Sequence, residues 1–256
     1  AIFPRLQQIH LKECSNQRSY SLTGMADRRL QDLGDEQPTP QCLQRIQHDL
    51  AELNADPPPG VFVSTEENDM TLLHAVIVGS WGTPIEGGFF HLVLKFPHDY
   101  PSRPPRVRFL TGVGKASFSG HIYSELVCLS VLGTAPGPSW NPAMNIGSLL
   151  VSIQSFLADG ASERMRYNTV SIAVCDTLED CLQNTDSPSV CPALSKQMLK
   201  YFVDNYAKYE GAVEAQIGSP GAFSWFKNIM IGDYEPLLKR LRDIKKKIDD
   251  HNTTAQ

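Results

Sequence analysis

Three short runs of strand-like sequence, joined by turns, limit the folds open to this chain more than any other feature. Residues 72–78 are apolar and β-branched, residues 88–96 are aromatic and aliphatic, and residues 106–110 alternate charged with apolar side chains. Such runs are typical of β-strands, and the segments between them carry the Gly, Pro and Asp residues of turns. A parallel pair needs a crossover of about a dozen residues or more. Because the joins are shorter, the sequence predicts an antiparallel meander.

A helix is predicted shortly before these strands. Thr39 is a typical N-cap residue, and Pro40 suits the first helical position. Four apolar residues then follow at helical spacing, which indicates one buried face: Leu43, Ile46, Leu50 and Leu53. Three consecutive prolines, beginning at Pro57, cannot continue the helix and therefore end it.

A long segment rich in Gly and Pro, residues 111–144, separates the strands from a second predicted helix. A loop of this length inside a compact domain is usually functional. Asn145 can cap the helix that follows, whose apolar stripe begins at Ile146 and ends at Leu157. Residues 1–37 show no sustained period, so we interpret them as a loosely ordered arm.

Two further amphipathic helices are predicted beyond Tyr167. The first carries this apolar stripe: Leu194, Met198, Phe202, Tyr209 and Val213. The second carries another: Leu237, Leu241, Ile244 and Ile248. Its other side bears five basic residues: Lys239, Arg240, Lys245, Lys246 and Lys247. These charges suit a solvated face near a helix C-terminus, and a docking surface is the alternative.

We divide the chain into three parts on these patterns. Residues 1–37 form the arm, residues 38–190 the core domain, and residues 191–256 a helical extension that we expect to pack on the core. The net charge is -5 and no Lys/Arg block stands outside the C-terminus, so we expect no nucleic-acid partner. No apolar run approaches the ~18 residues of a membrane-spanning helix, so we expect no membrane partner.

Cysteine usage limits the metal chemistry and the compartment. Six cysteines, at positions 14, 42, 128, 175, 181 and 191, are too sparse for a disulfide scaffold in a chain of 256 residues. There is no C-x-x-C pair, and no histidine lies near the loose group at 175–191, so we expect no bound metal. Cysteines that show neither a disulfide pattern nor a metal-binding pattern favour a reducing compartment, the cytoplasm or the nucleus.

Cys128 lies in the long irregular segment, between the strands and the second helix. A thiol in such a loop is placed where a partner can reach it, whereas the usual role of a free cysteine is that of a small buried hydrophobe. His121 stands seven residues upstream. A hydrolytic triad is not supported, because no nucleophile-elbow or protease signature surrounds Cys128.

Four motifs occur in order along the chain. They are Pro-Ile-Glu-Gly-Gly-Phe-Phe at 84–90, Tyr-Pro-x-x-Pro-Pro at 100–105, Val-Cys-Leu-Ser-Val-Leu-Gly at 127–133 and Trp-Asn-Pro-Ala at 140–143. In this order and spacing they resemble the ubiquitin-conjugating enzyme (E2) family. Within that family the chain is most similar to a long branch, through segments 42–46, 56–63 and 173–176 and the tyrosine-rich helix after Cys191.

The resemblance implies the α+β UBC (E2) fold. That fold has an N-terminal helix, a four-stranded antiparallel meander, an active-site loop, a central helix and, in this chain, the C-terminal helical extension. Cys128 is then the catalytic residue, which takes ubiquitin from an E1 as a thioester and passes it to substrate lysines. ATP is consumed by the E1, so no cofactor is implied in the chain itself. The long branch further implies charging by the second, less common ubiquitin E1, and use of ubiquitin or a tandem ubiquitin-like modifier.

The chain departs from the family pattern just before Cys128. The family usually has a His-Pro-Asn triplet, whose asparagine donates a hydrogen bond to the oxyanion formed during transfer. The matching residues here are Ser119, Gly120 and His121, with one residue fewer before the cysteine. His121 takes the place of the asparagine, either as the oxyanion donor or as a brace for the loop.

Three further residues match positions that face the thiol in the family. Ser130 replaces an aspartate that is common there, and Asp159 and Glu163 follow the central helix. A carboxylate at this place could orient or deprotonate the acceptor lysine. The alternative for both acidic residues is an ordinary surface charge.

Pro101, Ser102, Pro142 and Ala143 match the two loops with which E2 proteins meet RING and HECT-type E3 ligases. Ser102 replaces a bulky apolar residue that is often found at its position. Since interface energy usually rests on a few buried anchors, this replacement predicts weak or altered binding to common RING ligases. A role for the prolines in stiffening the turn is compatible with this reading.

A rival function is that of a catalytically weak or inactive E2-like scaffold, which binds ubiquitin or another E2 without chemistry. Inactive members of the family generally lack the cysteine, and this chain has it. The altered triplet at residues 119–121 is the reason why the scaffold function stays an alternative. A thiol-sensitive band shift on incubation with E1, ATP and ubiquitin separates the two functions.

Overall fold

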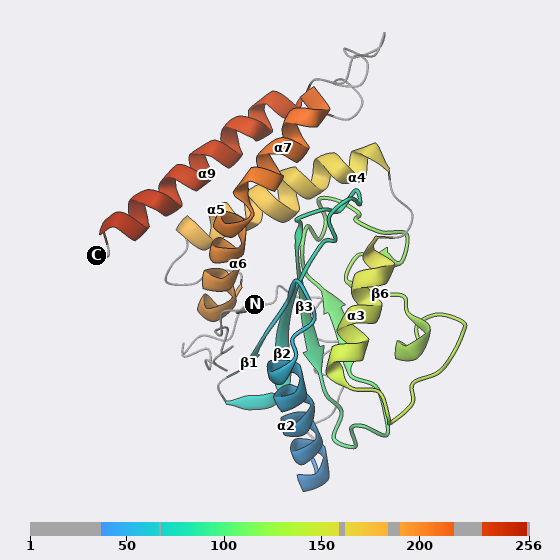
Figure 1. Ribbon diagram of the computed structural model, residues 1–256. Coiled ribbons are helices and arrows are strands. Elements are labelled where there is room, and N and C mark those ends of the chain that lie inside the picture. Colours follow the sequence, from blue (N-terminus) through green and yellow to red (C-terminus); the bar gives the residue numbers. More distant parts are fainter. Residues whose placement is uncertain (1–36, 67, 159–161, 184–189, 218–231, 255–256) are drawn as a thin grey trace, which may run out of the picture.

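Helices cover both faces of the sheet in this protein (Figure 1). A computed structural model describes residues 37–66, 68–158, 162–183, 190–217 and 232–254. All but the last residue of the expected arm, 1–37, lies outside these ranges. The α+β class and the predicted order of elements are confirmed. No helix in the described ranges is both long and apolar enough to cross a membrane.

Helix α2, Pro40–Ala55, begins and ends where its sequence predicts. The Thr39 hydroxyl accepts a hydrogen bond from the Cys42 N–H at 3.1 Å, and Pro40 stands in the first turn, where its missing N–H is not needed. The C-cap is Asp56, directly before the prolines. Three of the four predicted apolar residues, Ile46, Leu50 and Leu53, are buried, whereas Leu43 is half-buried. The buried face also includes Asp49, a polar residue that the apolar pattern does not explain.

The predicted meander is confirmed as four antiparallel strands. They are β1 (Val61–Glu66), β2 (Asp69–Val78), β3 (Phe89–Lys95) and β4 (Arg106–Phe109), each paired with the next. In the register, Ala75 of β2 lies opposite both Val63 of β1 and Leu92 of β3. The first strand is absent from the three runs recognised by pattern and was implied only by the family resemblance.

A short hairpin extends the sheet beyond the four predicted strands. Its strands are β5 (Ile122–Tyr123) and β6 (Leu126–Val127), and β6 pairs with β4 through Leu126 and Arg108. The sheet order is therefore β1-β2-β3-β4-β6-β5. Two-residue strands are too short to show an alternating pattern, which is why the sequence of 111–144 reads as irregular loop.

One core lies between the sheet and two helices, α2 and α3. Helix α3, Ile146–Leu157, has the predicted bounds, and its N-cap Asn145 accepts a hydrogen bond from the Ser148 N–H at 2.8 Å. Alternate residues of β2 belong to this core: Leu73, Ala75 and Ile77. Because alternate residues of a strand face opposite sides, Val76 and Val78 belong to a second core on the other face.

Six helical elements of the described chain follow α3. They are α4 (Glu163–Asn168), the π-helix η2 (Thr169–Asp176), α5 (Thr177–Gln183), α6 (Pro192–Asp204), α7 (Tyr206–Ile217) and α9 (Tyr234–Thr254). The prediction of only two helices in this region is wrong. The first three were missed because their segment lies between the two cores: Ala173 packs in the first core, and Val170 and Val174 in the second. Burial on opposite sides removes the single apolar stripe that signals a surface helix.

The helix predicted from Leu194 to Val213 is in fact two helices, α6 and α7. They meet at Asn205, whose backbone has φ −114° and ψ 13° and whose side-chain amide donates to the Tyr201 carbonyl at 3.0 Å. All five predicted apolar residues are nevertheless buried. The apolar stripe therefore continues across the break, so it does not reveal where one helix ends.

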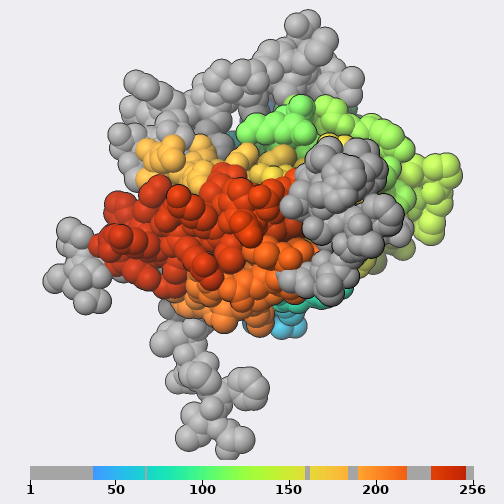
Figure 2. Space-filling view, turned by 90° about the horizontal axis from the view of Figure 1, so that it is seen from above, coloured from blue at the N-terminus to red at the C-terminus, as the bar shows by residue number. Residues whose placement is uncertain are grey.

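Helix α9 runs beside α7 on the surface of the molecule (Figure 2). Its predicted apolar stripe is buried in the second core. Three of the basic residues, Lys239, Lys246 and Lys247, are exposed as expected. Arg240 is an exception: it forms ion pairs with Asp176 at 2.8 Å and Glu179 at 2.7 Å, and so ties α9 to η2 and α5.

The second core also reaches the turn before β3. The Tyr209 hydroxyl of α7 donates to the Gly87 carbonyl at 2.7 Å. Gly87 has φ +70°, and a Cβ at this position would lie 2.4 Å from Tyr209 Cε1, so glycine is required here for both backbone conformation and space. The helices of residues 192–254 thus pack on the sheet itself.

Candidate active site

Cys128 directly follows strand β6 and is held by the β5–β6 hairpin. Its N–H donates to the His121 carbonyl at 2.8 Å, which continues the pairing of Ile122 with Val127. Val127 and Leu129, its neighbours in the chain, are buried, whereas Cys128 is half-buried. The backbone is therefore anchored on both sides of a thiol that keeps contact with solvent.

A hydrogen-bonded turn fixes the chain after Cys128. The Leu129 N–H donates to the Thr134 hydroxyl at 2.9 Å, and that hydroxyl donates to the Val127 carbonyl at 2.6 Å. A single side chain thus joins the residues on each side of Cys128. The turn of 3₁₀-helix η1, Ser130–Leu132, lies inside this loop and ends at Gly133 with φ 70°.

The other cysteines in the described ranges are buried: Cys42, Cys175, Cys181 and Cys191. Burial raises the pKa of Cys175 to about 12 and that of Cys181 to about 11. Burial likewise raises the pKa of Cys42. These thiols stay protonated at neutral pH and out of reach of a partner, so they behave as the small hydrophobes expected of most free cysteines.

His121 lies opposite Cys128 in the hairpin, so the structure brings these two predicted residues together. The backbone N–H of His121 donates to the Ser119 hydroxyl at 3.2 Å, and the Ser119 hydroxyl donates to the Phe156 carbonyl of α3. The imidazole ring meets the Phe156 ring edge to face, with centroids 4.9 Å apart. The loop before Cys128 is thus tied to the end of α3.

Two turns on the same side of the molecule carry Pro101 with Ser102, and Pro142 with Ala143. We name them the 101 turn and the 142 turn. Ser102, Pro142 and Ala143 are exposed, and Pro101 is half-buried. The Trp140 indole N–H donates to the Pro101 carbonyl at 2.7 Å, so the two turns are joined to each other.

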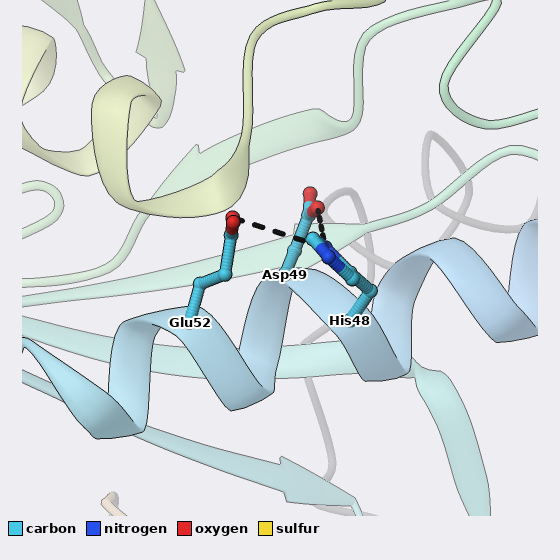
Figure 3. A group of neighbouring side chains, drawn as sticks. All are labelled: His48, Asp49 and Glu52. Atoms are coloured by element: carbon cyan, nitrogen blue, oxygen red, sulfur yellow. Dashed lines mark ion pairs between the residues drawn. The ribbon is translucent and has the colours of Figure 1, made fainter.

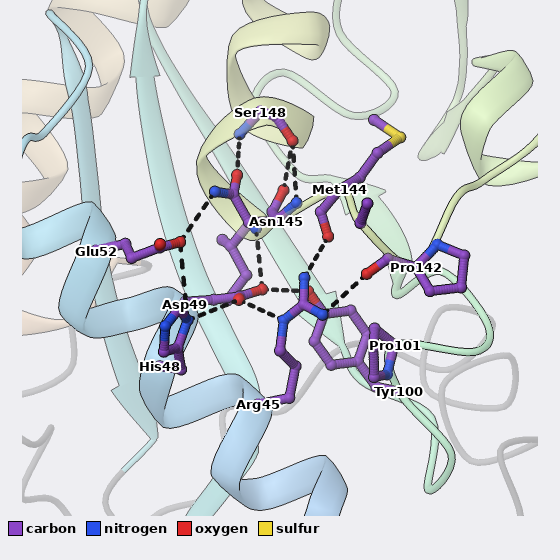
Figure 4. Close-up of polar contacts among 12 residues, drawn as sticks. Arg45, His48, Asp49, Glu52, Tyr100, Pro101, Pro142, Met144, Asn145 and Ser148 are labelled. Atoms are coloured by element: carbon purple, nitrogen blue, oxygen red, sulfur yellow. Dashed lines mark hydrogen bonds and ion pairs between the residues drawn. The ribbon is translucent and has the colours of Figure 1, made fainter.

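Both turns are also joined to helix α2 through a polar network (Figure 4). The Arg45 guanidinium donates to the carbonyls of Pro142 at 2.9 Å and Met144 at 2.7 Å. Its Nε donates to Asp49 at 2.6 Å. Asp49, only 1% exposed, also accepts from the Tyr100 hydroxyl at 2.5 Å.

His48, Asp49 and Glu52 have the side-chain types of a metal site, and within the described ranges they form the one such group (Figure 3). His48 Nδ1 lies 3.8 Å from a carboxylate oxygen of each acidic residue. Donors already engage these oxygens, however: Arg45 and Tyr100 bond Asp49, and the Asn145 amide donates to Glu52 at 3.2 Å. Because metal ligands need free lone pairs, the group fits a hydrogen-bonded junction better than a metal site.

The comparisons with known proteins agree on one family. A family model described as ubiquitin-conjugating enzyme matches residues 45–179, which include Cys128 and both turns. The chain belongs to the ubiquitin-conjugating enzyme (E2) family. The family recognised from the four motifs is therefore confirmed.

Two relatives named ubiquitin-conjugating enzyme E2 Z resemble this E2 protein over most of its length. The Danio rerio protein is 36% identical in an alignment 244 positions long, which covers 85% of this chain and 72% of the relative. The Homo sapiens protein is 36% identical in an alignment 254 positions long, which covers 88% of this chain and 69% of the relative. The long branch to which the sequence points is that of E2 Z.

Among solved structures, that of human ubiquitin-conjugating enzyme E2 G1 is 32% identical, with a TM-score of 0.42. The structural alignment covers 47% of this chain and 98% of the E2 G1 chain.

The remaining predicted residues of this E2 protein fall in different places. Ser130 begins η1 next to the thiol, and a Cβ on Gly137 would lie 2.8 Å from Ser130 Cβ. Glu163 begins α4 and contributes, after burial, to raising the pKa of Tyr234 to about 12. The described contacts of Glu163 do not bring it to Cys128. Asp159 lies outside the described residues.

Sequence reasoning missed the Arg45–Asp49–Tyr100 network. The signal in the sequence that could have revealed this network is Asp49, a charged residue within the apolar stripe formed by Ile46, Leu50 and Leu53. A carboxylate on an apolar face indicates a buried partner. Nothing in the local sequence identifies that partner as Tyr100, which is 51 residues away.

Proposed function

We propose that this E2 protein accepts ubiquitin or a ubiquitin-like modifier from an E1 as a thioester on Cys128 and transfers it to a lysine amine. The observation that carries the proposal is the contrast among its cysteines. Cys128 alone of the described cysteines is partly exposed, and it stands at the end of a hairpin in the segment that matches the family motif. The other described thiols are shielded by the protein.

The first step is an exchange between two thiols. The Cys128 thiolate attacks the thioester carbonyl carried by the E1, a new S–C bond forms, and the E1 thiolate leaves. The Cys128 thiol gives up its proton before attack. The anchored backbone at Val127 and Leu129 holds the sulfur at a fixed place while a large partner approaches.

The second step moves the modifier to an amine. The lysine nitrogen attacks the same carbonyl, an N–C bond forms, and Cys128 leaves as the thiolate while the amine loses a proton. The tetrahedral intermediate carries an oxyanion, which a preorganised N–H donor stabilises. We assign this donor to His121. Ser130, Asp159 and Glu163 are the residues proposed to orient or deprotonate the acceptor.

The partners follow from the same reaction. They are an E1, the modifier, E3 ligases that meet the 101 and 142 turns, and substrate proteins with accessible lysines. The likeness to E2 Z supports the second, less common ubiquitin E1 and a tandem ubiquitin-like modifier among the alternatives. The E1 consumes the ATP, so the reaction requires no cofactor on this chain. We place it in the cytoplasm or the nucleus.

The test is thioester formation by single-cysteine variants. With E1, ATP and ubiquitin, the parent should form an adduct that a reducing agent removes, and Cys128→Ala should form none. Cys175→Ala is the matched control, because it removes a buried thiol and should charge as the parent does. An adduct that persists in Cys128→Ala contradicts the assignment. A parent that binds ubiquitin but forms no adduct supports the scaffold instead.

A further inference from the structure

One face of α2 holds the segment that leads into α3. Arg45, Asp49 and Glu52 are spaced by four and three residues, so they lie along the same side of the helix. Arg45 bonds the carbonyls of Pro142 and Met144, Glu52 accepts from the Asn145 amide, and Asp49 accepts from the Ile146 N–H at 3.3 Å. Figure 4 shows these side chains reaching across from α2 to the 142 turn.

The guanidinium of Arg45 is suited to this position. It is planar, always charged and donates in several fixed directions, so it can bond two carbonyls and a carboxylate at once. A lysine ammonium is a single point donor and cannot reproduce that geometry. Arg45 also lies 5.8 Å from the centre of the Tyr100 ring, which places the same cation against the residue before the 101 turn.

Asp49 joins the 142 turn to the 101 turn. Its carboxylate, wholly removed from solvent, takes a hydrogen bond from the Tyr100 hydroxyl. Burial and the neighbouring Asp49 raise the pKa of Tyr100, so the phenol keeps the proton that it donates. The Trp140 ring packs 6.0 Å from that of Tyr100 and its N–H bonds Pro101. A buried carboxylate with these partners is costly to disturb, since removing one leaves an uncompensated charge.

We propose that Arg45 and Asp49 are positioning residues, which clamp the 101 turn and the 142 turn into one arrangement for an E3 ligase. The inference rests on the proposed function of these turns. A surface that is already ordered binds without the loss of entropy that ordering two loops requires. The clamp acts through the backbone carbonyls and Tyr100, and it leaves Ser102 and Ala143 free to meet the partner.

Arg45→Lys tests the clamp without a ligase. It keeps the charge beside Asp49 but loses the fork that bonds Pro142 and Met144. We expect backbone amides in 99–103 and 141–146 to exchange hydrogen about tenfold faster or more, the scale of losing one hydrogen bond to a charged group. Amides of β2 and β3 should be unchanged. Arg242→Lys is the matched control, because Arg242 bonds two carboxylates, Glu210 and Glu214, far along the chain from both turns.

Tyr100→Phe is the second variant, because replacing buried Asp49 would threaten the whole fold. It removes only the hydroxyl that bonds Asp49. We expect faster exchange in 99–103, with a smaller effect in 141–146. Unchanged exchange in both segments for Arg45→Lys and Tyr100→Phe would overturn the clamp, whatever the outcome of the activity assays.

The functional measurement compares discharge to free lysine with discharge stimulated by an isolated RING domain, chosen from a panel for its effect on the parent. For Arg45→Lys the RING concentration giving half-maximal stimulation should rise in inverse proportion to the fraction of molecules with ordered turns, about tenfold where a tenth of them stay ordered. Unstimulated discharge should stay within about twofold. A purely structural defect would lower both rates alike and would overturn the positioning role.

The same assay separates this inference from the proposed function. A parent that forms no thioester on Cys128 contradicts the proposed function, and the exchange experiment still decides whether the clamp exists. A parent that charges normally, but whose discharge no RING domain in the panel stimulates, contradicts the ligase role of the clamp. Loosened turns with an unchanged half-maximal RING concentration contradict it as well.

Discussion

Cys128 and His121 are joined through the backbone, by the hydrogen bond from the Cys128 N–H to the His121 carbonyl at 2.8 Å. Because this bond does not involve the imidazole, the hairpin pairing can survive replacement of the His121 side chain. The ring makes its own contact with Phe156 of α3. The chemical and bracing roles of His121 can therefore be separated by mutation.

We predict that His121→Ala slows discharge of the Cys128 thioester to free lysine by up to ~10²-fold, the scale of losing one oxyanion donor. Charging should change much less, because the attack on the E1 thioester occurs in an assembled complex. His121→Asn should restore most of the discharge, since an amide N–H also donates. Single-turnover discharge measured by gel provides the rates.

Thermal unfolding of the same variants checks the bracing role. If His121→Ala lowers the melting temperature and slows charging and discharge alike, His121 is a brace for the loop. If its discharge equals that of the parent, His121 has no part in the mechanism.

Strands β2 and β3 bring together two buried histidines. His74 Nδ1 and His91 Nε2 lie 3.1 Å apart. Burial lowers the pKa of His74 to about 4 and that of His91 to about 3, although Glu66 lies 3.3 Å from the other ring nitrogen of His74. A hydrogen bond between two imidazoles needs one N–H and one lone pair, so at least one ring is neutral. The lowered pKa values keep both rings neutral in the folded protein at neutral pH.

This pair should make the protein less stable in mild acid. In the unfolded chain the histidines take up protons below about pH 6.5, whereas in the folded chain they stay neutral down to about pH 4. The unfolded state therefore binds more protons as pH falls from about 6.5 to 4. The free energy of unfolding should decrease by up to about 1.4 kcal/mol per pH unit for each histidine.

Urea unfolding at several pH values between 7 and about 4.5 measures the slope. A double variant, His74→Gln with His91→Gln, should have a shallower slope than the parent. The control is Gln44→Ala, which changes an exposed residue that does not titrate and should leave the slope as it is. Equal slopes in the parent and the double variant would show that the pair does not titrate on unfolding.

At the scale of the whole molecule, the described residues form two cores that share the central strands. Val76, Val78 and Phe89 lie on the sheet face covered by the C-terminal helices. Phe89 also meets the rings of Tyr201 and Tyr209, with centroids 6.1 Å and 6.5 Å away. Arg240 adds an electrostatic link from α9 to η2 and α5. Removing α6, α7 and α9 would expose part of this face of β2 and β3 to water, because only η2 and α5 of the described helices would still cover it.

We predict that a chain ending at Cys191 is less stable than the full chain. Each large apolar side chain that is buried contributes about 1.5–3 kcal/mol to stability. Exposing Val76, Val78 and Phe89 should therefore lower the free energy of unfolding by more than about 3 kcal/mol. Urea unfolding gives the difference in free energy, and binding of a hydrophobic dye reports the uncovered face. An unchanged urea midpoint would mean that residues 192–256 form a separate module. The domain boundaries 38–190 and 191–256 stay predictions that this experiment tests.

Local chemistry determined much of the fold from the sequence alone. Thr39 and Asn145 cap α2 and α3, and the prolines from Pro57 stop α2, because capping groups and proline act on the backbone within a turn of their own position. The short turns likewise required the antiparallel meander. Cys128 was singled out by its motif, and its catalytic role stays a prediction for the charging assay to test.

Other features were decided only by tertiary structure. The burial of Asp49 depends on Tyr100, and the ion pairs of Arg240 depend on Asp176 and Glu179. These partners meet only after distant elements pack. The energy of a charged side chain is set by its solvation and its neighbours, which the local sequence does not contain. The sequence therefore determined α2, α3 and the antiparallel course of the meander, whereas packing decided which charges hold the turns and the C-terminal helix in place.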